Sequence, residues 1–167
     1  MVKMEELRKC FEALGFKNVV TYINSGNVGF DCGSPRVSKG ATSNAFLCNK
    51  IEQAVEEEFG RFFSVMVREQ KDIERILKNN PFDGDYESHK EMHVLFLKDK
   101  LPKEKADALK EAAFEGERYH VNGREIYCHL RRGVAESVIL GKNFIEKKLK
   151  VSTTARNWRT VQKLAEL

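Results

Sequence analysis

Two short segments of the 167-residue chain carry side chains suited to binding an anion. Asn24, Ser25 and Asn27 lie in the segment N-S-G-N, and Arg156 and Asn157 lie in the segment R-N-W-R near the end of the chain. Amide, hydroxyl and guanidinium groups all donate hydrogen bonds to phosphate or carboxylate oxygens. We predict these five side chains as binding residues, whereas the sequence assigns no catalytic residue.

Each segment also has a purely structural interpretation. Asn and Gly adopt positive φ angles easily, so the residue types of N-S-G-N are also those of a tight turn. Arg156 is predicted in the first turn of a helix that follows Thr154, where the helix macrodipole disfavours a cation without a partner. That partner is either a bound anion or a carboxylate of the protein itself. Thr153 and Thr154 are natural caps for this helix.

Metal and cofactor chemistry has little support in the sequence. An acid–base or metal patch would fit one predicted strand face, but alternating polar residues favour a solvated face instead; the residues are His120, Glu125, Tyr127 and His129. H-K-E-M-H at residues 89–93 lacks the spacing of a zinc-protease helix, and no dinucleotide fingerprint is present. We therefore predict no metal and no cofactor.

The elements that must position these residues form a repeat. Residues 21–32 (T-Y-I-N-S-G-N-V-G-F-D-C) and residues 119–130 (Y-H-V-N-G-R-E-I-Y-C-H-L) each read as two strands around a Gly-containing turn. An amphipathic helix precedes each hairpin and another follows it. A buried strand at residues 93–97 opens the second copy. In the first copy we expect the corresponding strand upstream of Met1.

The first hairpin has a predicted register. A two-residue turn at Ser25 and Gly26 would place Thr21 opposite Phe30 and Ile23 opposite Val28, with all four of these strand residues facing the core. A strand at residues 62–67 would close this first copy.

The order of strand, helix, hairpin, helix and strand is that of the ferredoxin-like plait. We predict an α+β protein with two ferredoxin-like halves and antiparallel sheets, the first half missing its opening strand. The first half covers residues 1–68, a connecting helix and loop residues 69–90, and the second half residues 91–167. The second sheet has no obvious closing strand unless residues 138–140 supply one, and a C-terminal helix would bury Trp158. An open sheet edge in the first half predicts a homodimer.

Composition sets the broad class. Hydrophobic residues make up 41% of the chain, which suffices for a packed core, and the net charge of +4 is mild. Nucleic acid is a candidate partner if five basic residues form a binding patch, whereas the alternative is an ordinary solvated face; the residues are Arg131, Arg132, Lys147, Lys148 and Lys150. No apolar run is long enough to cross a membrane, and four scattered cysteines fit a reducing compartment. We predict a cytoplasmic protein without a membrane partner.

Taken together, these segments resemble a bacterial family of proteins of unknown function, DUF1697. The similarity lies in V-K-M-E-E-L-R (residues 2–8), T-Y-I-N-S-G-N-V-x-F (21–30), N-P-F (80–82), N-G-R-E-x-Y-x-H-L (122–130), N-F-I-E-K-K-L (143–149) and T-T-A-R-N-W-R (153–159). Members of the family usually open with a strand and a loop R-G-I-N-V-G-G ahead of V-K-M, and this sequence starts after that loop. The resemblance implies a fold but no reaction.

Three functions stay open from the sequence. The first is a module that binds a ligand or a polyanion, since no nucleophile–base pair is visible. The second is an enzyme or a small-molecule binder whose site for phosphate or carboxylate lies between the two halves. The third is a protein-interaction domain that receives a partner strand at its open sheet edge.

Overall fold

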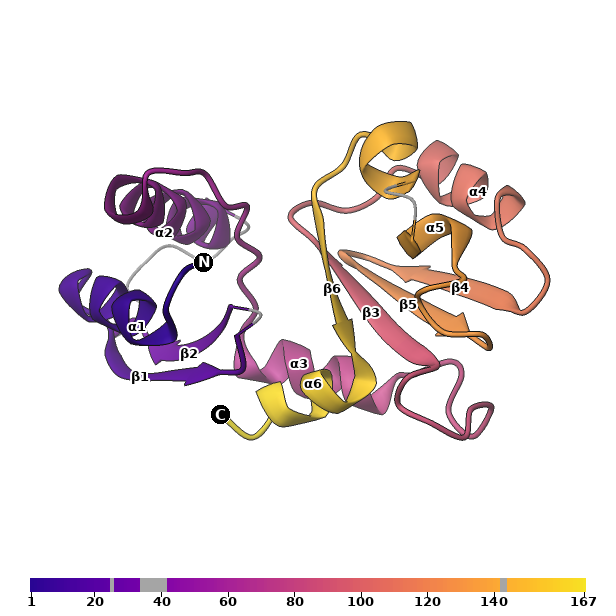
Figure 1. Ribbon diagram of the computed structural model, residues 1–167, viewed down its shortest axis with the longest axis horizontal. Helices are drawn as coiled ribbons and strands as arrows, with labels where there is room; N and C mark the ends of the chain where they lie inside the picture. Colours follow the sequence, from indigo (N-terminus) through magenta and orange to yellow (C-terminus); the bar gives the residue numbers. More distant parts are fainter. Residues whose placement is uncertain (25, 34–41, 142–143) are drawn as a thin grey trace. The chain divides into compact units, whose positions relative to one another are not determined.

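The computed structural model describes residues 1–24, 26–33, 42–141 and 144–167 (Figure 1). The chain divides into two compact units, which are treated separately below. Unit 1 comprises residues 1–68 with 166–167, and unit 2 comprises residues 69–165.

Unit 1 is built from two helices and one hairpin. Helix α1 (Met4–Ala13) leads into the antiparallel strands β1 (Lys17–Tyr22) and β2 (Asn27–Asp31), and helix α2 (Thr42–Phe59) follows. The core forms where α1 and α2 bury every third or fourth residue against the hairpin. Its buried members are Leu7, Phe11, Phe16, Ile51 and Val55.

The predicted register of the first hairpin is wrong. Thr21 pairs with Val28 instead of Phe30, because the connection between the strands takes four residues rather than two. Ile23, predicted in the core, has a φ of 49° and is 48% exposed. A β-branched residue in the left-handed region cannot continue a strand, so β1 ends at Tyr22.

The predicted closing strand of the first half is also absent from the structure: residues 62–67 are described but form no strand. Phe63, Val65 and Val67 nevertheless pack against the core of unit 1. In unit 2 the strand at the same place in the element order pairs only with the opening strand of its own sheet. The described part of unit 1 holds no such opening strand, which explains why this segment forms no ladder.

Unit 2 contains a four-stranded antiparallel sheet. Its elements are α3 (Gln70–Lys78), β3 (Met92–Leu97), α4 (Lys103–Glu111), β4 (Glu117–Asn122), β5 (Glu125–Leu130), α5 (Val138–Gly141), the π-helical turn η1 (Ile145–Leu149), β6 (Thr153–Asn157) and α6 (Trp158–Leu164). The strand order is β4-β5-β3-β6. Strand β5 therefore lies between β3 and β4, which α4 connects, and this split β-α-β order is that of the ferredoxin-like plait. The predicted α+β class with antiparallel sheets is confirmed.

Two boundaries near the C-terminus differ from the prediction. Residues 138–140 lie in helix α5, so they do not close the sheet. The closing strand is β6, in a segment predicted to cap and begin the last helix. Consecutive threonines at its start favour an extended strand, and the helix begins only at Trp158.

Both faces of the second sheet are covered (Figure 1). Helix α4 and η1 bury Leu109, Ile145 and Leu149 against one face. On the other face lie α6 and α3, and the Tyr127 hydroxyl donates a hydrogen bond of 2.8 Å to the Ile76 carbonyl of α3. The predicted solvated face of β5 is therefore wrong, because Glu125, Tyr127 and His129 are all buried.

Candidate functional site

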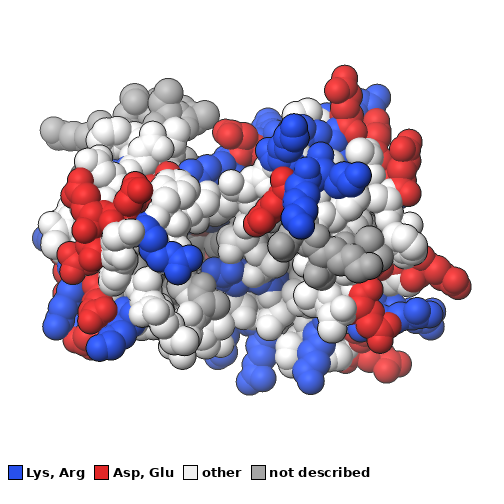
Figure 2. Space-filling view, turned by 45° about the horizontal axis from the view of Figure 1, so that its top comes forward, with Lys and Arg blue, Asp and Glu red and all other residues white. Residues whose placement is uncertain are grey.

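A basic hollow on unit 2 has a volume of about 330 Å³ and is called the lysine hollow here. Four lysines and one aspartate border it, so cations outnumber anions around a small volume. Its lining residues are Leu97, Lys98, Asp99, Lys100, Pro102, Lys105, Lys150, Val151 and Ser152. Figure 2 shows a group of Lys and Arg side chains on the surface of unit 2, with acidic side chains beside it.

Strand pairing brings these lysines together. Leu97, the last residue of β3, pairs with Thr153, the first residue of β6. Because the two strands are antiparallel, the end of β3 lies beside the start of β6. Lys98, which follows β3, and the segment from Lys150 to Ser152, which precedes β6, therefore lie at the same end of the sheet. Lys105 comes from the first turn of α4, which begins just beyond this edge.

Lys150 reaches the hollow through an uncommon backbone conformation. It ends η1 with φ 52° and ψ 44°, the left-handed conformation in which glycine is usual. A residue with a side chain costs free energy in that region, and such outliers cluster at functional sites. The position of Lys150 therefore adds weight to the lysine hollow as a site.

The predicted basic patch divides into two parts in the structure. Lys150 joins the lysine hollow, whereas Arg132 lines a second hollow of about 280 Å³. That second hollow also contains Glu115, Glu117 and Glu136, so its carboxylates offset the guanidinium. Of these two hollows, only the lysine hollow has more positively than negatively charged lining residues, and Arg131, Lys147 and Lys148 line neither of them.

The predicted binding residues of the first hairpin belong to unit 1. Asn24 is exposed in the turn, and Ser25 lies outside the described residues. Asn27 is buried, and its Nδ2 donates a hydrogen bond of 3.1 Å to the Tyr22 carbonyl across the end of the hairpin. This contact fixes the turn, as the structural interpretation of N-S-G-N requires.

The predicted binding residues near the C-terminus belong to unit 2. Arg156 lies in β6, and its Nη1 donates to Thr154 Oγ1 at 2.6 Å and to the Ala155 carbonyl at 2.8 Å. Burial lowers the pKa of Arg156 from its ordinary value. Asn157 caps α6, because its Oδ1 accepts a hydrogen bond of 2.9 Å from the Thr160 amide. A ligand site that combines these residues with Asn24 and Asn27 stays a prediction.

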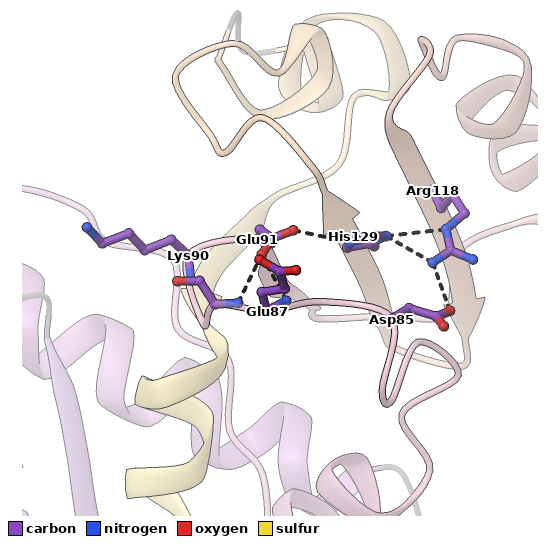
Figure 3. A network of polar contacts seen from close by, with 7 residues as sticks. Asp85, Glu87, Lys90, Glu91, Arg118 and His129 are labelled. Carbon is purple, nitrogen blue, oxygen red and sulfur yellow. Dashed lines mark hydrogen bonds and ion pairs between the residues drawn. The ribbon is translucent and has the colours of Figure 1, made fainter.

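A polar cluster that the sequence did not reveal surrounds His129 (Figure 3). Arg118 donates to His129 Nδ1 at 3.3 Å from Nε and to Asp85 Oδ2 at 2.9 Å from Nη2. On the other side, Glu91 Oε1 lies 3.8 Å from His129 Nε2. Glu91 Oε2 also accepts hydrogen bonds from the amides of Glu87 and Ser88. The cluster thus attaches the loop before β3 to strands β4 and β5.

The packing around this cluster is aromatic and leaves His129 only 7% exposed. The Phe82 ring lies 4.7 Å from the Arg118 guanidinium and 5.9 Å from the imidazole ring of His129. Burial and the Arg118 charge lower the pKa of His129, while Glu91 and Asp85 act in the opposite direction. At neutral pH the imidazole is therefore uncharged and accepts from Arg118, which suits a structural contact rather than a general acid.

The shifted pKa predicts a loss of stability in mild acid. The unfolded chain protonates this histidine near pH 6.5, whereas the folded protein does so only at lower pH. The free energy of unfolding should therefore fall as the pH drops below about 6.5, with a slope of at most roughly 1.4 kcal/mol per pH unit from one histidine. Urea denaturation at several pH values measures this slope.

His129→Gln should flatten that pH dependence, because glutamine can still accept from Arg118 but does not titrate. The matched control is His120→Gln, since His120 is exposed on β4. Part of the slope should remain in His129→Gln because burial also lowers the pKa of His93, and both shifted histidines are retained in the control. Equal slopes in wild type and His129→Gln would contradict the prediction.

Two kinds of feature are absent from the described residues. No helix within those residues is both long and apolar enough to span a bilayer. No group of three or more His, Cys, Asp and Glu side chains within residues 1–24, 26–33, 42–141 and 144–167 is arranged to hold a metal ion.

Comparison with known proteins places the chain in a family. A solved structure of a conserved bacterial protein from Streptococcus pneumoniae is similar, with a TM-score of 0.72 and 22% sequence identity over 99% of this chain and 88% of that chain. At this identity the likeness establishes the fold alone. No curated protein matches the sequence. Residues 1–127 match the model of a family described as proteins of unknown function, DUF1697, and the chain therefore belongs to that family.

Proposed function

We propose that this protein is a polyanion-binding module whose phosphate site is the lysine hollow of unit 2. The observation that carries the proposal is the convergence of four lysines with one aspartate around about 330 Å³. Positive charges that border one small volume repel one another, and a bound phosphate would relieve that repulsion. A concave site of one charge sign also raises the local concentration of oppositely charged ligands.

The backbone beside the hollow supports the same ligand chemistry. Helix α4 begins at Lys103, directly after the lining residue Pro102. The first turn of a helix presents unpaired N–H groups and a partial positive charge, which together favour anions. Lys105 adds a cation at the end of the helix where the macrodipole disfavours one. A phosphate in the hollow would stabilise both the first turn of α4 and the positive charge of Lys105.

The exposure of the rim favours an extended ligand. Lys100, Pro102, Lys150 and Ser152 are all exposed, so the hollow is open to solvent along one side. A single-stranded nucleic acid or an inorganic polyphosphate can pass across such a surface and place one phosphate in it. The proposal does not depend on base recognition, since phosphate contacts alone supply sequence-independent affinity.

The test is a binding titration with the wild-type protein. Protein purified at low salt is titrated into labelled single-stranded RNA, labelled polyphosphate and a labelled nucleoside triphosphate, and fluorescence anisotropy is recorded at several salt concentrations. We expect both polymers to bind, with an affinity that falls as the salt concentration rises. Absence of binding by every one of these probes at low salt would overturn the proposal. Binding of the triphosphate alone would replace the polymer with a small phosphorylated ligand.

Lys150 should show a trade-off between binding and stability. Lys150→Gly should raise the free energy of unfolding by about 0.5–1 kcal/mol, because relief of the left-handed strain, roughly 1–2 kcal/mol, exceeds the added chain entropy of glycine, roughly 0.5–1 kcal/mol. The same change should weaken polymer binding, because one ammonium group leaves the lysine hollow. Urea denaturation and anisotropy measure the two effects.

The matched control for this prediction is Lys150→Gln, which removes the charge but keeps a side chain at the strained position. It should weaken binding as much as Lys150→Gly does, without the gain in stability. A glycine variant that binds like the wild type would remove Lys150 from the site.

The cellular setting completes the proposal. All four cysteines are free thiols, which supports a reducing cytoplasm as the compartment. A homodimer through the sheet edge of the first half stays a prediction, and polyanion binding at the lysine hollow does not require it.

A further inference from the structure

One carboxylate borders the lysine hollow, and phosphate binding alone does not account for it. It belongs to Asp99, which lies between Lys98 and Lys100 in the loop that joins β3 to α4. A carboxylate repels phosphate, so Asp99 lowers the affinity of the hollow for any ligand that offers phosphate groups only. Such a group discriminates in favour of a ligand that carries a hydrogen-bond donor beside its phosphate.

Asp99 has no structural partner that explains its place. It is exposed, and in the part of the chain that the structure describes it forms no hydrogen bond and no ion pair. It does not cap α4, because the cap residue of that helix is Pro102, which makes no side-chain hydrogen bond. The two oxygens of an ionised carboxylate can only accept hydrogen bonds. Both oxygens of Asp99 are therefore available to a donor on a bound ligand.

RNA combines the two features that the lysine hollow requires. Each internal phosphate of RNA is joined to a ribose whose 2′-hydroxyl group donates a hydrogen bond, and this hydroxyl lets a protein distinguish RNA from DNA. Acidic side chains are common partners of a ribose 2′-hydroxyl in nucleotide-binding proteins. DNA carries the same phosphates without that hydroxyl, so it would meet the repulsion of Asp99 with no compensating contact.

We propose that Asp99 is a specificity-determining residue of the lysine hollow, where it accepts a hydrogen bond from a ribose 2′-hydroxyl while the lysines hold the neighbouring phosphate. The inference rests on the polyanion binding proposed above. It names the preferred ligand as single-stranded RNA rather than single-stranded DNA. Asp99 thus selects the sugar, whereas the lysines supply most of the affinity.

The test compares three labelled single strands of equal length and base sequence by fluorescence anisotropy at low salt: RNA, DNA and 2′-O-methyl RNA. The methyl ether keeps the 2′-oxygen but removes the donor. We expect the wild-type protein to bind RNA about fivefold more tightly than DNA, as one net hydrogen bond supplies. The 2′-O-methyl RNA should bind as DNA does.

The variant Asp99→Ala separates hydroxyl recognition from charge. It should bind DNA more tightly than the wild type does, because the repulsion is removed, and the ratio of RNA affinity to DNA affinity should fall to about one. The matched control is Asp107→Ala, since Asp107 is exposed on α4 and does not line the lysine hollow. The control makes the same change in net charge and should keep the wild-type ratio.

A divalent cation that bridges Asp99 to a phosphate is the competing explanation. All titrations are therefore run once with EDTA and once with Mg²⁺, because a direct hydrogen bond needs no metal. A preference for RNA that disappears in EDTA would overturn the inference.

Two further results would also overturn it. The first is equal affinity of the wild-type protein for RNA and DNA, and the second is an RNA preference that persists in Asp99→Ala. Each of these leaves polyanion binding at the hollow intact. Absence of binding by all three strands would instead overturn both the proposed function and the role of Asp99.

Discussion

Reversing two charges in the lysine hollow, in the double variant Lys105→Glu with Lys150→Glu, should weaken the binding of single-stranded RNA by about tenfold or more at low salt, or about 1.4 kcal/mol. Both side chains line the hollow, and each reversal replaces an attraction for phosphate with a repulsion. Fluorescence anisotropy with the same labelled RNA measures the change.

The salt dependence gives a second readout of the same variant. For single strands, the slope of log K against log salt concentration changes by about 0.7 for each phosphate that the protein neutralises. Loss of two contacts should therefore reduce that slope by roughly 1.4. A fold defect would lower the amount of active protein but leave the slope of the remaining binding unchanged.

The matched control is Lys90→Glu with Lys110→Glu. Both lysines are exposed in unit 2, and neither lines the lysine hollow, while the change in net charge is the same. If affinity and slope fell equally in the control, binding would follow the overall charge of the protein, and the lysine hollow would not be the site.

The largest expected effect on stability is that of Leu109→Ala in α4. Leu109 is fully buried in the core of unit 2, so the change should cost about 2–5 kcal/mol through lost burial and the cavity that remains. Leu7→Ala makes the same change at the corresponding helix of unit 1. It should cost only about 1–2 kcal/mol. Most apolar residues packed around Leu7 are only partly buried, so the change removes less buried apolar area and the cavity can collapse more easily.

Native-state hydrogen exchange of the two units measures both costs in one protein, since each unit reports its own opening. Leu109→Met and Leu7→Met keep the side-chain volume and should each cost less than about 1.5 kcal/mol. Equal costs for the two alanine variants would show that the core of unit 1 is as closed as that of unit 2.

Sequence reasoning predicted the second hairpin well because its pattern is complete. The Asn122 and Gly123 turn follows a clear alternation, and Tyr119, Ile126 and Cys128 all point into one core as predicted. The first hairpin offered the same kind of signal but failed in register. Its N-S-G-N segment does not reveal that the preceding Ile23 already leaves the strand with a positive φ.

The lysine hollow could not be predicted because it depends on a strand that was assigned to a helix. Lys98 and Lys150 are far apart in the sequence, and only the pairing of β3 with β6 brings them together. The His129 cluster was not predicted from the sequence for a related reason. Asp85 and Glu91 lie in a segment with no periodic pattern, so nothing local indicated that Asp85 contacts Arg118 of β4 and that Glu91 lies near His129 of β5.

The central position of β3 has a consequence for how the protein is made. Leu97 can pair with Thr153, its partner in β6, only after the ribosome has added the 56 residues that follow Leu97. At a synthesis rate of about 5–20 residues per second, that delay is roughly 3–11 s. During this interval a strand of almost wholly apolar residues has an unpaired edge, so a nascent chain is most prone to aggregate between the synthesis of β3 and that of β6. Slowing of the ribosome within residues 98–152 would lengthen the exposure, whereas the same delay after residue 157 would leave the sheet complete.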